Sequence, residues 1–186
     1  MWFVLFIITA AVWSKPPEAL NLSEAEKSAL QANEMIIRDA SAGTAIGVIH
    51  INADPRVVLE EVVNLQARVE EVSLIDGLEL YIDENDKKGA RWELSMAGID
   101  VQFHVVYQIN WDNGWCTFDL DPTKDNSITD SSGSYKTEPI PDGTRLYYRS
   151  YAASANPAPN WVRKALSQHS MKQQLKGIKA RAEARN

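Results

Sequence analysis

The central part of the chain alternates between apolar and polar residues with period two. From Ile99 to Trp111 every odd-numbered position is apolar, and most even-numbered positions are polar. Because successive side chains of a strand point to opposite faces, this segment predicts a single strand, which at roughly 3.4 Å per residue would be about 40 Å long. A strand of that length is expected to bend around another part of the molecule.

Further strands are predicted on both sides of this segment, because their apolar residues alternate or are β-branched and turn residues separate them. The Asp112-Asn113-Gly114 and Pro141-Asp142-Gly143 sequences predict two of the hairpin turns. The other predicted strands are residues 44–51, 72–82, 92–96, 116–120, 133–137 and 144–152. Together they predict a seven-stranded antiparallel sheet.

Helical spacing occurs at three places in the sequence. Ser23 and Glu26 form a capping-box pattern that predicts a helix over about 24–38. Asp54 and Pro55 provide an N-cap and a first-turn proline for a helix that continues to about Leu65. A long amphipathic C-terminal helix is predicted by apolar or small residues three and four positions apart, namely Trp161, Ala165, Gln168, Met171, Leu175, Ile178 and Ala182.

These elements predict an α+β fold in which a curved sheet wraps around the C-terminal helix, because only that helix is long enough to cover the apolar face. A helix is about 10 Å wide, and a strongly bent sheet encloses more than that. Large side chains either fill the remaining space or line a pocket. The candidate inward-facing residues are Trp92, Leu94, Met96, Val101, Phe103, Val105, Tyr107, Phe118, Tyr135, Leu146, Tyr148, Trp161, Ala165 and Gln168.

The orientation of the last strand follows from the cost of burying charge. Leu146 and Tyr148 are expected to face inward, because the opposite register would bury Arg145 and Arg149 in an apolar interior.

The sequence predicts three successive parts of the chain, the first of which is an apolar N-terminal segment. Residues 1–14 begin with the uncharged run MWFVLFIITAAVW, which is shorter than the ~20 residues that span a bilayer. Small residues at Thr9, Ala11 and Ser14 offer cleavage positions, so residues 1–14 are expected to be a signal peptide or a membrane anchor. Residues 15–43 then form a helical extension, and residues 44–186 form a ligand-binding domain. The protein is accordingly expected to be exported, to the periplasm or the medium, or anchored to a membrane.

Composition and charge narrow the choice of partners. The formal net charge is -6 and the isoelectric point is about 5.1, which argues against nucleic acid as a partner. A local exception is the basic C-terminal segment that contains Arg163, Lys164, Lys172, Lys176, Lys179, Arg181 and Arg185. These cations either attract an acidic membrane surface or form a solvated helix face.

No catalytic or metal-binding pattern is recognisable. His50, His104 and His169 have no ligand-type residue at a metal-binding spacing, so neither a metal nor a cofactor is predicted. Cys116 lacks an adjacent base and is expected to fill the core. The acidic pairs Glu60-Glu61 and Glu70-Glu71 are expected to be solvated on helix faces.

Three stretches resemble the helix-grip superfamily of START and SRPBCC proteins, and most closely its polyketide cyclase and coenzyme Q-binding group. They are Ile51-Asn-Ala-Asp-Pro55 with Val58-Leu59 and Asn64-Leu65; Asp130-Ser-Ser-Gly133-Ser-Tyr135 with Glu138-Pro139 and Asp142 to Tyr148; and Pro159-Asn-Trp161-Val with Met171-Lys-Gln-Gln-Leu175. The resemblance covers about residues 44–184. Leu59, Asn64 and Tyr135 depart from the tryptophan, aspartate and tryptophan that are usual in this group.

The resemblance implies a hydrophobic cavity between the sheet and the long helix that takes up lipids, isoprenoid quinones or polyketides. We therefore expect non-catalytic binding or carriage of a hydrophobic small molecule, whose polar head is oriented by Gln168, Tyr107 or Tyr148. One alternative is a polyketide cyclase or dehydratase in which pocket tyrosines donate protons. Another is a membrane-anchored accessory protein with a closed core and a basic face against lipid head groups.

Overall fold

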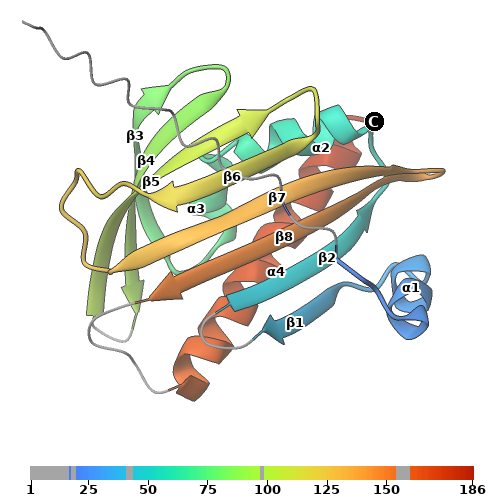
Figure 1. Cartoon of the computed structure of the whole chain (residues 1–186), viewed down its shortest axis with the longest axis horizontal. Coiled ribbons are helices and arrows are strands. Elements are labelled where there is room, and N and C mark those ends of the chain that lie inside the picture. Colours follow the sequence, from blue (N-terminus) through green and yellow to red (C-terminus); the bar gives the residue numbers. More distant parts are fainter. Residues whose placement is uncertain (1–16, 18–19, 41–43, 97–98, 154–159) are drawn as a thin grey trace, which may run out of the picture.

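A single antiparallel sheet curves around the long C-terminal helix α4 in the computed structural model (Figure 1). Residues 17, 20–40, 44–96, 99–153 and 160–186 are described, and for residues 39, 40, 96, 99 and 160–167 only the backbone is described. The helices are α1 Glu24–Gln31, α2 Pro55–Val63, α3 Ala67–Glu71 and α4 Asn160–Ala184. The strands are β1 Ile36–Ala40, β2 Thr44–Ile51, β3 Ile75–Asp83, β4 Lys87–Met96, β5 Ile99–Asn110, β6 Trp115–Leu120, β7 Asp130–Ile140 and β8 Gly143–Ala153.

The strands from β3 to β8 form a meander, and β2 and β1 extend the sheet beyond β8. The spatial order is β1-β2-β8-β7-β6-β5-β4-β3, so β2 pairs with the last strand rather than with β3. Helices α2 and α3, which connect β2 to β3, lie with α4 behind the sheet in the view of Figure 1. The predicted architecture of a curved sheet around a terminal helix is thereby confirmed.

The sheet has eight strands in the described residues, not the seven predicted, because the first helix is shorter than expected. Its capping box forms as predicted, but the helix ends at Gln31. Asn33 adopts a left-handed φ of 65°, and Asn33 and Glu34 donate backbone hydrogen bonds to Leu30 and Ala29 in a Schellman-type ending. The following residues, Ile36 to Ala40, pair with β2. The extension predicted for residues 15–43 is therefore partly a strand of the sheet.

The strand predicted over residues 72–82 is also corrected. Residues 67–71 form helix α3, and Val72 follows it as the C-cap residue. Strand β3 starts at Ile75, and its pairing with β4 has irregularities between Ile75 and Gly77 and between Leu80 and Ile82. Leu80 stays in register with Leu78, opposite Ala90, but it is 37% exposed because β3 is the edge strand of the sheet.

One end of the interior, which we call the closed end, is filled by apolar side chains from α2, α4 and β2. Leu59 and Val62 of α2 and Leu175, Ile178 and Ala182 of α4 are almost completely buried there. Gly47 of β2 permits close packing, since a Cβ at this position would lie only 2.5 Å from the Leu175 Cδ1 atom. The last turns of α4 are therefore held tightly against the sheet and α2.

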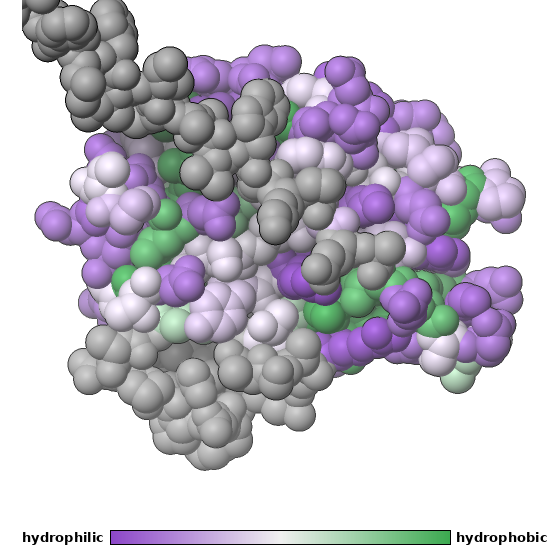
Figure 2. Space-filling model, in the orientation of Figure 1, coloured by the Kyte–Doolittle hydropathy of each residue, from purple (hydrophilic) through white to green (hydrophobic). Residues whose placement is uncertain are grey.

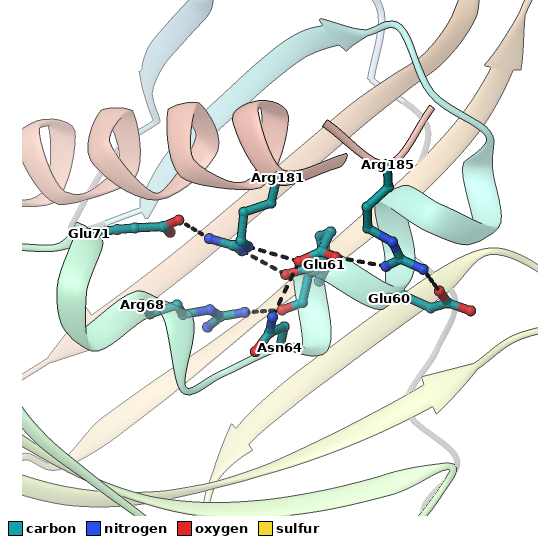
Figure 3. Close-up of polar contacts among 8 residues, drawn as sticks. Glu60, Glu61, Asn64, Arg68, Glu71, Arg181 and Arg185 are labelled. Carbon is teal, nitrogen blue, oxygen red and sulfur yellow. Dashed lines mark hydrogen bonds and ion pairs between the residues drawn. The ribbon is translucent and has the colours of Figure 1, made fainter. Parts of the chain in front are cut away.

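Ion pairs join the same end of α4 to α2 and α3 (Figure 3). Arg181 pairs with Glu61 at 2.8 Å and with Glu71, and Arg185 pairs with Glu61 and Glu60 at 2.7 Å each. Glu61 is only 5% exposed. The expectation that these acidic residues are solvated is therefore wrong for Glu61 and Glu71, and neither Arg181 nor Arg185 is a free surface cation.

The convex face of the sheet is partly covered by α1. Leu30 of α1 packs with Ile46 and Val48 of β2 in a separate small cluster. On the described residues of the face in view, hydrophobic colour occurs in separate areas among hydrophilic side chains (Figure 2). None of the helices in the described parts of the chain is long and apolar enough to cross a membrane, and the predicted signal or anchor segment, residues 1–14, lies outside those parts.

Candidate functional site

A cavity of about 240 Å³ lies between the concave face of the sheet and α4. We call it the sheet–helix cavity. Its lining includes residues from α3, β3 to β8 and α4. The predicted site residues that line it are Trp92, Leu94, Phe103, Val105, Tyr107, Phe118 and Tyr148. The long apolar face of β5 is thus opposite α4 and contributes Phe103, Val105 and Tyr107 to the cavity.

The other predicted site residues are placed differently. Tyr135 and Leu146 are fully buried without lining the described cavity, and Val101 and Gln168 are half-buried outside its lining. The side chains of Met96, Trp161 and Ala165 lie outside the described residues. Burial of Leu146 and Tyr148 confirms the predicted register of β8, but the closed-end packing leaves Leu146 no space for a ligand.

The rings of Tyr107, Phe118 and Tyr148 form an aromatic wall of the sheet–helix cavity, and Tyr135, which does not line the cavity, packs against them. The Tyr107 and Phe118 ring centroids are 5.5 Å apart, those of Phe118 and Tyr148 6.5 Å, and the Tyr148 ring stacks on Tyr135 at 4.2 Å. Gly133 of β7 makes this arrangement feasible, since a Cβ there would lie 2.4 Å from the Phe118 Cζ atom. The wall is therefore both apolar and rigidly packed.

Sequence patterns did not indicate Arg68, a buried cation in the cavity lining. It belongs to α3, which the sequence did not predict, and is 4% exposed. Its Nη1 atom donates to the Tyr107 hydroxyl at 3.3 Å and its Nη2 atom donates to the Val62 carbonyl. Among the described residues no carboxylate forms an ion pair with it. The rings of Trp92, Tyr107 and Tyr135 surround it at 5.4 to 5.9 Å.

Gln174 of α4 is the second polar residue missed by the sequence analysis. We assign its amide with the oxygen toward Arg68, because the reverse orientation would direct an N–H group at the guanidinium. The oxygen then accepts hydrogen bonds from Arg68 Nε and Nη1 at 2.9 Å each and from the Tyr135 hydroxyl at 2.7 Å. Gln174 is thus a neutral acceptor that positions Arg68 from the helix side.

The charge of the guanidinium is not balanced by ionised groups close to it. Burial raises the pKa of Tyr107 to about 12 although Arg68 lowers it, and burial raises the pKa of Tyr135 well above its usual value. Burial likewise raises the pKa of Cys116 to about 12, against a lowering effect of Arg68. These groups are neutral at pH 7, whereas an arginine in a protein stays protonated. Among the described residues that line the cavity, Arg68 at the α3 side is therefore the one charged group.

The described residues bring no nucleophile together with a base. Cys116 is fully buried with a neutral thiol, which fits the core role expected for it. His104 lies on the convex face, near Asn126 and the edge of the Tyr81 ring, and His169 is exposed on α4. Within the part of the chain that the structure describes, no three side chains are arranged to hold a metal ion. The described lining of the cavity offers hydrogen-bond donors and apolar contact.

A wider depression of about 1290 Å³ lies beside the closed end, between α1, the β7–β8 turn and the end of α4. Its cations already have acceptors. Lys179 forms an ion pair with Glu183 at 3.0 Å, and Arg145 forms one with Glu138 at 3.2 Å and donates to His50 Nε2. More than half of the residues that line this depression are polar or charged, and none is Phe, Tyr or Trp. The sheet–helix cavity, which has an aromatic wall, is therefore the candidate site.

Comparisons with known proteins identify the fold. No family model matches the sequence. No curated protein matches it either. Solved structures do match: the Zhui aromatase/cyclase from Streptomyces sp. R1128 is 11% identical with a TM-score of 0.65, covering 76% of this chain and 94% of that one.

Two further structures give the same result. A STAR-related lipid transfer protein from Xanthomonas axonopodis is 14% identical with a TM-score of 0.64, covering 78% of this chain and 90% of that one. A START superfamily protein from Mycobacterium smegmatis is 16% identical with a TM-score of 0.63, covering 78% of this chain and all (100%) of that one. The chain therefore has the helix-grip fold of START and SRPBCC proteins, as the sequence resemblance implied.

Proposed function

We propose that the protein binds or carries a hydrophobic small molecule in the sheet–helix cavity without converting it chemically. The observation that carries this proposal is the unfilled space between the aromatic wall and α4, in an interior whose other end is fully packed. Removing apolar ligand surface from water would contribute roughly 25 cal/mol per Å² to binding. Arg68, Tyr107 and Gln174 would orient the polar end of the ligand.

The names of the structural neighbours support this class of ligand. One is a lipid transfer protein and another is an aromatase/cyclase, so the same fold serves lipid transfer and an aromatase/cyclase in other chains. A lipid, an isoprenoid quinone or a polyketide-like molecule would each place apolar atoms against the wall of Phe103, Phe118 and Tyr148.

The volume of the cavity limits how much of the ligand is enclosed. At about 240 Å³ it is slightly smaller than typical ligand pockets of roughly 300–1,000 Å³, and it corresponds to about eight water volumes of roughly 30 Å³ each. A ring system or a short acyl chain fits this space. A longer chain would have to extend out of the cavity.

Extraction and uptake test the proposal together. The purified full-length chain is extracted with organic solvent and analysed by mass spectrometry, and the delipidated protein is titrated with a fluorescent fatty-acid analogue. Ser150→Phe should weaken uptake at least about tenfold by filling the cavity. The matched control Ser134→Phe adds the same ring on the neighbouring strand at a position outside the lining and should bind as the wild type does. No extracted molecule and no uptake by the wild type would refute the proposal.

A second candidate is a cyclase or dehydratase, favoured by the contact between Arg68 Nη1 and the Tyr107 hydroxyl. That hydroxyl accepts from the guanidinium and keeps its own proton available to a substrate carbonyl. Turnover of a poly-β-ketone analogue that is lost in Tyr107→Phe and Tyr148→Phe would support an enzyme. Turnover that both variants retain would remove the tyrosines from this role.

Export and membrane contact are separate parts of the proposal. Residues 1–14 would direct the chain across or into a membrane, and the mass of the mature N-terminus measures whether they are cleaved. Of the basic C-terminal residues with described side chains, Lys172 and Lys176 are exposed, whereas Arg181 and Arg185 are in ion pairs. Co-sedimentation with vesicles that does not increase with anionic lipid would contradict a role for these lysines in membrane binding.

A further inference from the structure

The chemical nature of the ligand can be inferred from the buried guanidinium of Arg68. A charged side chain in an apolar interior costs several kcal/mol unless an opposite charge or a complete set of hydrogen bonds compensates it. The described partners of Arg68 are a phenol, a backbone carbonyl and an amide, all of which are neutral. The site therefore lacks an anion where it holds a cation.

The nearby carboxylates do not supply that anion. Glu71 is three residues further along the same short helix, but it pairs with Arg181, and its second oxygen lies over Gly177, where a Cβ would be 2.0 Å away. Glu61 of α2 pairs with Arg181 and Arg185. Figure 3 shows both carboxylates directed toward α4, while the Arg68 guanidinium lies apart from them against the Val62 carbonyl.

The guanidinium also borders the space that a ligand would enter. Arg68 lines the sheet–helix cavity together with Trp92, Leu94 and Phe103, which are apolar. The Gln174 oxygen accepts from Nε and from one N–H of Nη1 at 2.9 Å each, and the Val62 carbonyl accepts from Nη2, so these contacts fix the plane of the group. The other N–H of Nη1 makes only a long contact of 3.3 Å to the Tyr107 hydroxyl, so it is available to a stronger acceptor.

We propose that the ligand is a hydrophobic monocarboxylic acid. Its carboxylate binds against Arg68, and its apolar part lies along the apolar lining residues Trp92, Leu94 and Phe103. This inference rests on the proposed binding function. The carboxylate accepts from Arg68 Nη1 and from the Tyr107 hydroxyl, which turns its proton toward the ligand. One cation selects a monoanion, and the absence of a described carboxylate in the cavity lining leaves no partner for an amine.

Three ligands of equal chain length separate the effect of head-group charge on affinity from the effect of hydrophobicity. The delipidated full-length protein is titrated at pH 7 with octanoate, 1-octanol and octylamine, and binding is measured by isothermal titration calorimetry. Octanoate should bind at least about tenfold more tightly than octanol, because each of its two charge-assisted hydrogen bonds exceeds a neutral one by about 1 kcal/mol and a tenfold ratio represents about 1.4 kcal/mol. Octylamine should bind most weakly.

Substitution of the cation tests its role. In Arg68→Met the ratio of octanoate to octanol affinity should fall to one or below, and in Arg68→Lys octanoate should stay preferred. Arg91→Met is the matched control, because Arg91 is a half-buried arginine that pairs with Glu79 and Glu93 and does not line the cavity. It should keep the ratio of the wild type. If Arg68→Met does not fold, the wild-type ratio and Arg68→Lys still decide the outcome.

The outcomes separate this inference from the function on which it rests. Equal affinity for octanoate and octanol in the wild type, or a ratio that Arg68→Met leaves unchanged, would overturn the acid proposal while hydrophobic binding stands. Binding of none of the three probes, with no uptake of the fluorescent analogue, would overturn hydrophobic binding itself. A preference for octanoate that persists in Arg91→Met and disappears in Arg68→Met supports both.

Discussion

Arginines occupy two environments along helix α4, which differ in the charge of their partners and in how completely the adjacent space is filled. At the closed end, Arg181 and Arg185 have three carboxylate partners, Glu60, Glu61 and Glu71, and the adjacent core is filled. At the cavity, Arg68 has neutral partners among the described residues, and unfilled space lies beside it. In the first environment each arginine has a carboxylate partner, although the second oxygen of Glu71 is buried without a hydrogen bond. In the second environment the cation has no counter-ion among the described residues.

This difference shows how one helix can contribute both to the stability of the fold and to the binding of a ligand. Among the described side chains of α4, residues 168–186, the ion pairs to α2 and α3 lie in the last turns of the helix, whereas the cavity lies beside Ser170, Met171 and Gln174. Because the anchoring does not depend on the cavity, the cavity end can keep free volume and an uncompensated charge. Stability should therefore respond to substitutions at the closed end, and ligand affinity to substitutions at the cavity.

The largest difference in the free energy of unfolding is expected between alanine substitutions of two leucines. Leu175→Ala removes a fully buried side chain from the closed end and should lower the free energy of unfolding by about 3–4 kcal/mol. Leu94→Ala should cost about half of that or less, because Leu94 is only half-buried and already borders empty space. Urea denaturation measures both values. Equal losses would contradict the division of the interior into a filled and an unfilled end.

The two arginine environments can be compared by one substitution at each. Arg181→Met leaves Glu61 and Glu71 without their shared partner and should lower the free energy of unfolding by about 2–3 kcal/mol, slightly less than for a fully buried pair. Arg68→Met removes a buried charge that has no counter-ion and should change it by less than about 1 kcal/mol. A larger loss from Arg68→Met in urea denaturation would mean that the cation is structural.

The pH dependence of stability should reflect the ionisation of Glu61 at the closed end. Burial alone would raise the pKa of Glu61, but hydrogen bonds from Arg185 and Arg181 outweigh it, and the pKa falls below the usual 4.5. A lowered pKa means that the stabilisation is complete above about pH 4.5 and is lost as the pH falls further. Denaturation at a series of pH values should show this loss in the wild type and in Arg68→Met, and less of it in Arg181→Met. Identical curves for all three would contradict it.

The smallest effect is expected at Cys116, a fully buried residue of β6 that does not line the cavity. Burial raises the pKa of its thiol to about 12, and the side chain has no exposed surface. Thiol reagents at pH 8 should modify it only after unfolding, with or without a bound acid. Rapid labelling of the native protein would show that the cavity reaches further into the sheet than described.

The sequence predicted the architecture because most of its signals are local. Alternation over residues 99–111 predicted the long strand, and Asp54 and Pro55 predicted the start of α2, where the Asp54 carboxylate accepts from the Arg56 backbone at 2.8 Å. It did not predict β1, because the left-handed turn at Asn33 has no obligatory residue type. Cavity-lining residues on regular strands were also found from their alternation.

The polar part of the site could not be predicted for a physical reason. Arg68 lies on a five-residue helix that shows no periodicity, and its partner Gln174 is 106 positions further along the chain. Similarly, Glu61 and Arg181 are 120 residues apart, so no spacing rule connects them. The burial of a charge depends on tertiary contacts of this kind, and a local pattern of apolar residues does not contain them.

The most direct test follows the side-chain Nε–H resonance of Arg68 by nuclear magnetic resonance while octanoate is added to the full-length protein. The signal is assigned by its disappearance in Arg68→Lys. We predict that it shifts in proportion to the occupancy of one site, and that 1-octanol leaves it nearly unchanged. Octanoate binding that leaves this resonance unmoved, or equal shifts with acid and alcohol, would contradict the assignment of Arg68 as the group that receives the ligand.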